Sequence, residues 1–147
     1  WLPPERKWVN KFGETFTFDQ LTAELMQRPL DKSVCVGSHV VQAMIVLARA
    51  DHEECSILSP EIRGKLMDRL TAIVREVEAT QMDDGSWGPD LYERLLVDRG
   101  PEQRDWSIDS RSVEGRLLAT SHVSEWLMLL PEELRVSVER PIDKASR

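Results

Sequence analysis

The chain contains two near copies of one short segment, SHVVQAM at residues 38–44 and SHVSEWL at residues 121–127. Each copy carries a histidine that a Gln or a Glu follows three residues later, and in a helix these two side chains are neighbours. Self-similarity of this kind is typical of folds that stack one supersecondary unit on the next. The sequence therefore predicts a repeated helical architecture, and the two histidines indicate where to look for chemistry.

A second similar segment follows each copy, so that the chain contains two repeat-like units. LSPEIR at residues 58–63 resembles LPEELR at residues 130–135. We place the units at around 34–82 and 113–140, each with an inner helix that an outer helix follows. Stacked helical hairpins bury a continuous core in this way, although arrays normally contain more than two units.

Length and charge limit the classes of protein to which the chain can belong. Residues 1–147 have the length of a single helical domain, and 41% hydrophobic residues are enough to form a core. A formal net charge of -7 with scattered basic residues argues against nucleic acid as a partner. No apolar run has the length of a transmembrane segment. The chain begins at Trp1 without a signal peptide, so we expect a fragment or processed piece of a longer protein, whose compartment stays open.

Apolar periodicity predicts helices over most of the chain. Residues 1–17 show no period, whereas residues 18–27 show a helical pattern with Asp19 as its expected N-terminal cap. Residues 34–50 are apolar on nearly every face, which is typical of a buried helix. We interpret residues 51–57, which include His52, as a polar and solvated connection.

The second half of the chain continues the helical pattern. Residues 59–61 (SPE) read as N-cap, first helical position and first-turn acid of a long amphipathic helix that ends near Gln81. Residues 113–130 form another helix, and a last short helix starts at Pro131. The fold class that we predict is therefore all-α, with about five to six helices.

A turn and a surface excursion separate the two units. Residues 81–88 (QMDDGSWG) contain two glycines and an Asp-Gly pair, which predict a tight turn. We interpret Gln81, Gly85 and Trp87 as a structural staple: the indole packs across the helix end, while Gln81 bonds carbonyls that the helix leaves unpaired. Between residues 89 and 112 we expect a short helix and a polar excursion with Trp106, a candidate for partner contact.

Gln81, Gly85 and Trp87 resemble the Gln-x3-Gly-x-Trp core of the QW motif of squalene and terpene cyclases and their prenyltransferase relatives. Over residues 34–135 the chain is also similar to a group of uncharacterised bacterial proteins with toroid-like domains. This resemblance implies an α/α toroid-like helical-hairpin array, here a partial toroid. The segments that carry the bacterial likeness are Cys35-x-Gly37-Ser38-His39, Leu58-Ser59-Pro60, Gln81 to Trp87 and Ser121-His122-x-x-Glu125-Trp126.

The known toroid enzymes each require a residue that this chain lacks. Class II cyclases use an Asp-x-Asp-Asp acid, whereas the paired acids at residues 83–84 lie in the predicted turn. Prenyltransferases hold zinc with Asp-x-Cys, and Ser33 stands here two residues before Cys35. The Cys-His-Gly element of lanthionine-forming cyclases is also absent. We therefore expect a non-catalytic helical binding or scaffolding module of a larger bacterial protein, with a protein partner.

A metal site is the alternative. Cys35 and His39 are spaced i and i+4, and His122 with Glu125 would come alongside if the repeated helices pack side by side. Sulfur and imidazole suit zinc, which would indicate a zinc-dependent or terpenoid-related enzyme domain. In the structural interpretation Cys35 is a small buried hydrophobe, both histidines are buried and hydrogen-bonded, and no cofactor is needed. A third alternative is an isoprenoid- or lipid-binding domain that retains the toroid's cavity.

Overall fold

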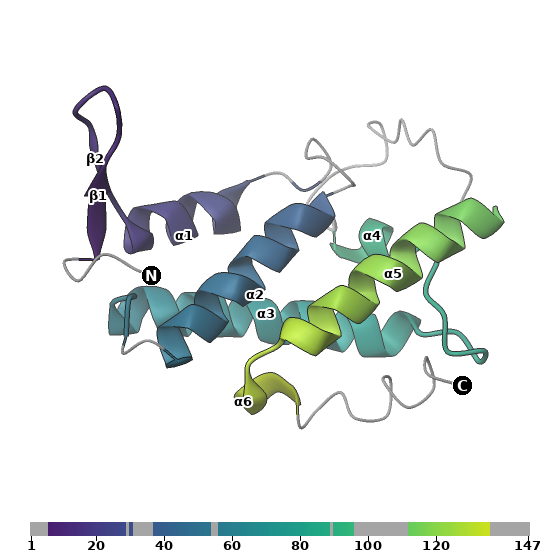
Figure 1. The fold of residues 1–147 in the computed structure, drawn as a ribbon. Coiled ribbons are helices and arrows are strands. Elements are labelled where there is room, and N and C mark those ends of the chain that lie inside the picture. Colours follow the sequence, from purple (N-terminus) through teal and green to yellow (C-terminus); the bar gives the residue numbers. More distant parts are fainter. Residues whose placement is uncertain are drawn as a thin grey trace.

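The computed structural model describes residues 6–28, 30, 37–53, 56–88, 90–95 and 112–135. Of these residues 73% are helical, which confirms a mainly helical fold. The helices are α1 (Phe18–Gln27), α2 (Ser38–Glu53), α3 (Pro60–Thr80), α4 (Asp90–Leu95), α5 (Val113–Leu129) and α6 (Glu132–Arg135). In Figure 1, α5 and α2 lie in front of α3, which passes behind both of them.

The described N-terminal residues form a β-hairpin, so the all-α prediction is wrong for this segment. Strand β1 (Lys7–Val9) pairs antiparallel with β2 (Thr15–Thr17). Trp8 lies opposite Phe16 with ring centroids 5.9 Å apart, and a cross-strand aromatic pair of this kind stabilises a short sheet. Strands of three residues are too short to show the alternation from which a strand is predicted, and the hairpin was missed for that reason.

Helix α1 begins at a capping box that differs from the predicted cap. The Thr17 hydroxyl accepts a hydrogen bond from the Gln20 N–H at 3.1 Å, and the Gln20 side chain accepts one from the Thr17 N–H at 2.9 Å. Because Thr17 occupies the cap position, Asp19 lies in the first turn. Its carboxylate instead accepts from the backbone N–H of Ser59 at 2.9 Å, which ties α1 to the start of α3.

The start of α2 is fixed by close packing. Gly37 has a φ of +79°, and a Cβ at this position would lie 2.6 Å from the Cβ of Leu30, so that only glycine fits. The buried Ser38 hydroxyl then donates to the Tyr92 hydroxyl of α4 at 2.9 Å. These two contacts determine where the next residue, His39, is placed.

Helix α3 follows the sequence prediction closely. Its N-cap Ser59 accepts from the Ile62 N–H at 3.4 Å, Pro60 stands in the first turn, and the helix ends at Thr80. Neither α3 nor any other helix within the described ranges combines the length and the apolar character needed to cross a bilayer.

Each of the two repeat-like units contains an equivalent arginine contact, in addition to the shared sequence pattern. Arg63 of α3 donates to the Asp51 carbonyl at 3.3 Å, in the last turn of α2. Arg135 of α6, which occupies the equivalent position of the repeat, donates to the carbonyls of Met128 at 2.7 Å and Leu130 at 2.8 Å. Both arginines therefore donate to carbonyls at the end of the preceding helix, and the Asp51 carbonyl also accepts from the Ser56 N–H at 3.0 Å.

Helices α2 and α5 lie side by side and run in the same direction (Figure 1). His39 near the start of α2 meets His122 of α5, whereas His52 near the end of α2 lies beside Glu133, just after α5 ends. The core fills the space between these helices, α3 and α4. Its largest fully buried side chains are Trp87, Trp126, Met44, Ile45, Leu66, Leu70, Leu91, Leu130, Val41, Val77 and Val123.

Candidate functional site

The structure brings the two repeated histidines together. The rings of His39 and His122 pack edge to face, with centroids 5.4 Å apart and an interplanar angle of 76°. The contact exists because α2 and α5 are neighbours that run in the same direction. The two histidines therefore form one cluster, although they are 83 positions apart in the sequence.

The structural interpretation of the sequence expects both histidines to be buried and hydrogen-bonded, and the structure differs from it at each of them. His39 is exposed, so the prediction of burial is wrong for this residue. The His122 side chain is 12% exposed, and neither ring nitrogen has a hydrogen-bond partner. Its Nδ1 lies 3.5 Å from Glu125 Oε2, a separation that counts as an ion pair when the ring is protonated but does not meet hydrogen-bond geometry.

The structure does not place the remaining predicted metal ligand relative to this cluster. Cys35 lies outside the described residues. Within those residues there is no group of three or more His, Cys, Asp or Glu side chains that could surround an ion. His122 contacts both His39 and Glu125, and these three described side chains do not surround an ion.

The predicted staple divides its hydrogen bonds differently from our expectation. Trp87 is fully buried, and its indole N–H donates to the Val77 carbonyl in the last turn of α3 at 2.7 Å. Gln81, which we expected to bond that helix end, donates to the Gly85 carbonyl at 3.0 Å within the turn. Gly85 has a φ of +82°, the left-handed conformation that such a turn favours in glycine.

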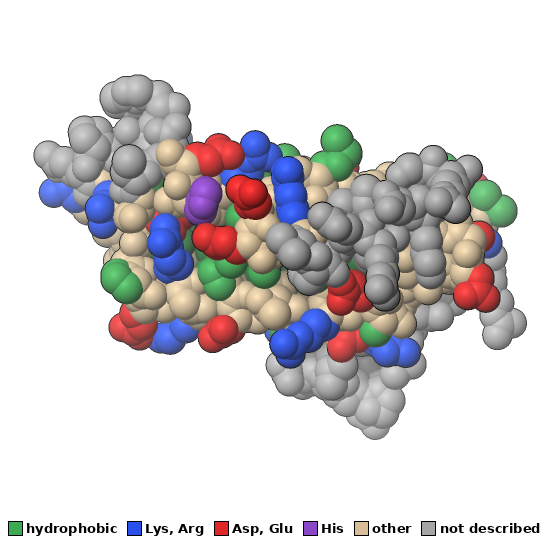
Figure 2. All heavy atoms as spheres, turned by 90° about the horizontal axis from the view of Figure 1, so that it is seen from below, with side chains coloured by type: hydrophobic (Ala, Val, Ile, Leu, Met, Phe, Trp, Pro, Cys, Tyr) green, Lys and Arg blue, Asp and Glu red, His purple; other side chains and the backbone are tan. Residues whose placement is uncertain are grey.

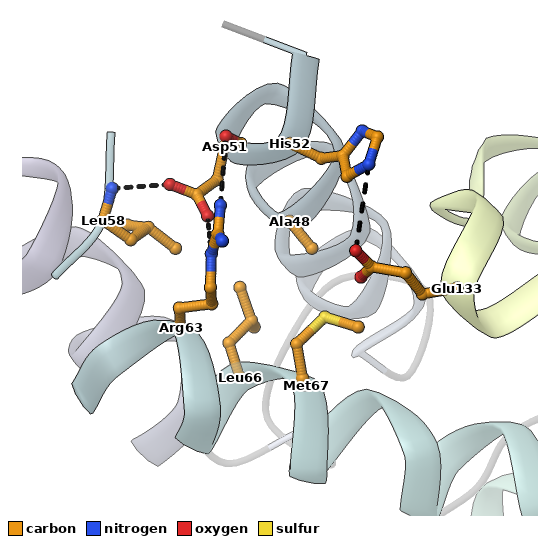
Figure 3. Close-up of a pocket in the computed structure, with 8 residues that line it drawn as sticks. All are labelled: Ala48, Asp51, His52, Leu58, Arg63, Leu66, Met67 and Glu133. Atoms are coloured by element: carbon orange, nitrogen blue, oxygen red, sulfur yellow. Dashed lines mark hydrogen bonds and ion pairs between the residues drawn. The ribbon is translucent and has the colours of Figure 1, made fainter. Parts of the chain in front are cut away.

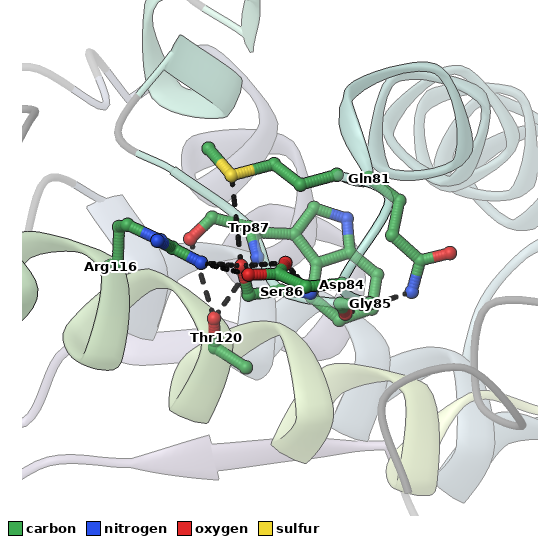
Figure 4. A network of polar contacts seen from close by, with 8 residues as sticks. Gln81, Asp84, Gly85, Ser86, Trp87, Arg116 and Thr120 are labelled. Carbon is green, nitrogen blue, oxygen red and sulfur yellow. Dashed lines mark hydrogen bonds and ion pairs between the residues drawn. The ribbon is translucent and has the colours of Figure 1, made fainter. Parts of the chain in front are cut away.

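A polar network on the outside of this turn joins it to α5 (Figure 4). Arg116 reaches from α5 to the carboxylate of Asp84, and its guanidinium also donates to the Ser86 hydroxyl at 2.7 Å. Hydrogen bonds from the Ser86 hydroxyl and backbone N–H, together with Arg116, lower the pKa of Asp84 from 3.8 to about 2. Thr120 of α5 accepts from the Trp87 N–H at 3.0 Å.

Asp51 is a buried site that the sequence analysis missed. We interpreted residues 51–57 as solvated, but α2 continues to Glu53 and the Asp51 side chain is 2% exposed. Its carboxylate accepts from the Leu58 N–H at 2.8 Å and pairs with Arg63 (Figure 3). An acid in the last turn of a helix is normally exposed, so the burial of Asp51 follows from its packing against α3 and its pairing with Arg63 rather than from the local sequence.

A small cavity lies beside Asp51, between α2, α3 and α6 (Figure 3). His52 and Glu133 stand at its edge with Nε2 and Oε1 3.8 Å apart, and both side chains are exposed. The cavity volume is about 60 Å³. Small-molecule sites occupy roughly 300–1,000 Å³, so this cavity is too small for an isoprenoid or lipid chain.

One side of α5 is apolar and exposed. Val113 is 81% exposed, Leu117 69% and Met128 72%, although large apolar side chains are normally withdrawn from water. Together with Ser121 and Ser124 they follow a spacing of four, four, three and four residues, which places all five on one face of the helix. We call these five residues the α5 stripe. The opposite face of α5 packs into the core through Ala119, Val123, Trp126 and Leu127.

Two further expectations concern the surface. Trp106 lies outside the described residues. Figure 2 shows acidic and basic side chains interspersed on the face seen from below, without a continuous patch of either sign among the residues described there.

Comparisons with known proteins identify no relative: no family model matches the chain, and neither does any curated protein or solved structure.

Proposed function

We propose that this chain is a non-catalytic helical binding module of a larger bacterial protein, and that its α5 stripe binds an amphipathic helix of a partner protein. The observation that carries the proposal is the exposure of three large apolar side chains along one face of a helix whose other face lies in the core. Large apolar side chains that are exposed along one face of a helix are characteristic of interaction sites.

The shape of the stripe suits a helix. Ser121 and Ser124 form its middle, and both hydroxyls donate to carbonyls of α5 itself, at 2.9 Å to Leu118 and 2.8 Å to Thr120. Their polar groups therefore need no partner from outside. Small residues at the centre allow close approach, while the apolar side chains at either end supply the buried area. From residue 113 to residue 128 the stripe extends about 22 Å, the length of four helical turns.

The negative charge beside the stripe favours a basic partner. The exposed Glu114 and Glu125 lie next to the stripe on one flank, and the chain carries a formal net charge of -7. A helix with Lys or Arg beside its apolar residues would be attracted to this surface, whereas a second copy of the chain would meet like charge. The partner that we propose is accordingly a basic amphipathic helix.

We also infer the finer architecture, a helical-hairpin array of the α/α toroid type. The supporting observations are the shared direction of α2 and α5 and the equivalent helix-capping contacts of Arg63 and Arg135. In an array each inner helix has a neighbour on two sides. Helix α5 has α2 on one side, and the partner's helix would take the second place.

A photo-reactive amino acid at position 117 tests the proposal. The chain is mixed with lysate of its source organism and irradiated, and the cross-linked peptides are identified by mass spectrometry. We expect peptides from a helix with apolar residues at i, i+3 and i+4 and with basic flanks. A Met128→Glu change should weaken capture by about ten-fold or more, because it places a carboxylate in the contact.

Val9→Glu is the matched control, because Val9 is also exposed but lies on the β-hairpin. Capture of the same peptides by the Met128→Glu protein would contradict the stripe as the binding surface. Cross-links from the chain to itself, with a dimer in sedimentation experiments, would replace the partner helix by a second copy.

A further inference from the structure

We propose that His39 and His122 together form an open binding site for a divalent transition-metal ion such as Zn²⁺. The site joins the two repeat-like units, because each histidine belongs to one of them. It is independent of the α5 stripe, since neither ring belongs to it. The two imidazoles supply the ligands, and solvent completes the coordination.

The separation of the rings agrees with a shared ion. Zinc binds imidazole nitrogen at about 2.0–2.1 Å, so two rings on one tetrahedral ion have centroids roughly 5 Å apart. The centroids of His39 and His122 are 5.4 Å apart. Their steep interplanar angle of 76° also suits ligands that approach an ion from different directions. Binding needs ring rotations that turn one nitrogen of each imidazole towards the ion, and the exposure of His39 leaves its ring free to make them.

The surroundings of His122 indicate which nitrogen would bind. A histidine that ligates a metal commonly has a carboxylate beside its other ring nitrogen, which orients the ring and raises its basicity. Glu125 Oε2 stands 3.5 Å from Nδ1 of His122, which leaves Nε2 for the ion. Both nitrogens are buried without a hydrogen-bond partner, and a buried polar atom in this state is costly. An ion at Nε2, with Glu125 drawn closer to Nδ1, would satisfy both.

Ligand type determines the class of ion. Imidazole suits Zn²⁺, Ni²⁺ and Cu²⁺, whereas Mg²⁺ and Ca²⁺ require oxygen ligands. Because the described residues contain no group of three suitable side chains, the site would keep open positions. Open positions are characteristic of sites that exchange their metal or bind a further ligand.

Titration calorimetry of the metal-free protein with ZnCl₂ and NiCl₂ tests the proposal. We expect one ion per chain, and affinity at least about ten-fold lower in His39→Ala and in His122→Gln, since each removes a ligand. His52→Ala is the matched control because it removes the third and last histidine of the chain. Unchanged binding in His39→Ala, or loss of binding in His52→Ala, would overturn the assignment.

Further variants separate this site from other sources of affinity. Glu125→Gln should weaken Zn²⁺ binding by about ten-fold while the circular dichroism spectrum stays unchanged. Cys35→Ser should retain binding, and loss of binding in this variant with retention in His39→Ala would assign the site to the thiolate instead. Met128→Glu should bind metal normally, because the metal site and the stripe are separate. Absence of binding by the unmodified protein overturns the proposal outright.

Discussion

Two junctions fix α3 within the fold, and each contains an aspartate with an arginine partner. At the junction of α2 and α3, Asp51 is 2% exposed and accepts hydrogen bonds from Arg63 and from the Leu58 N–H. At the turn after α3, Asp84 is 57% exposed and pairs with Arg116 of α5. The two ion pairs join the same residue types, but one carboxylate is buried and the other is exposed.

The comparison teaches that burial, more than the pairing of charges, decides which group stabilises a junction. In the first junction the buried group is the carboxylate itself, and its removal would leave an interior N–H without an acceptor. In the second junction the buried group is Trp87, whose indole N–H satisfies the end of α3. The carboxylate of Asp84 lies in water, where an ion pair contributes little.

The largest expected effect is that of Trp87→Ala. The change removes a fully buried aromatic ring and the hydrogen bond to the Val77 carbonyl, so we expect unfolding free energy to fall by about 4 kcal/mol. Urea melts followed by circular dichroism measure it. Trp87→Phe should cost clearly less, because it keeps most of the ring volume. A loss below about 1 kcal/mol for Trp87→Ala would mean that the turn is not held by the indole.

Asp51→Ala comes next, with an expected loss of about 2–3 kcal/mol. The substitution leaves the buried Leu58 N–H without an acceptor and removes the partner of Arg63. Asp51→Asn keeps an acceptor for the N–H, so the same urea melts should give a smaller loss. If the two variants prove equally stable, the hydrogen bond to Leu58 is not the source of the effect.

Thr120→Val probes the link between the second junction and α5. The Thr120 hydroxyl accepts from the Trp87 N–H at 3.0 Å and donates to the Trp87 carbonyl at 3.3 Å. Valine keeps the shape but neither bond, and we expect a loss of about 1 kcal/mol in thermal or urea unfolding. Ser124→Ala is a suitable control, since its hydroxyl bonds only the backbone of its own helix in the described contacts. An equal loss in both variants would argue against a specific role of Thr120.

The sequence was most informative where structure depends on neighbouring residues. Helix α3 could be predicted with its ends because Ser59 and Pro60 act within a single turn, and because its apolar residues recur over 21 positions. The repeat also predicted that His39 and His122 would meet if their helices were neighbours, which they are. Local signals and internal repetition were enough for these features.

The features that the sequence did not predict depend on partners far along the chain. Arg116 pairs with Asp84 across 32 positions, and Asp19 accepts a hydrogen bond from the Ser59 N–H across 40. Asp51 is buried because of where α3 lies, although a polar segment follows it in the sequence. No pattern of neighbouring residues reports such contacts, since they are set by the packing of complete helices.

The smallest effect, and the sharpest test of the comparison, is the response of Asp84 to acid. Ser86 and Arg116 hold the pKa of Asp84 at about 2 in the folded chain, against 3.8 for the ordinary group. A lowered pKa in the folded state means that the ionised carboxylate stabilises the fold above about pH 4, and that this contribution is lost as the pH falls towards 2. Carboxyl chemical shifts followed by NMR give the pKa directly. The free energy of unfolding of Asp84→Asn should be nearest to that of the unmodified protein at about pH 2, and should differ slightly more at pH 5. If that difference instead equalled the effect of Asp51→Asn at pH 5, exposure would not be what distinguishes the two junctions.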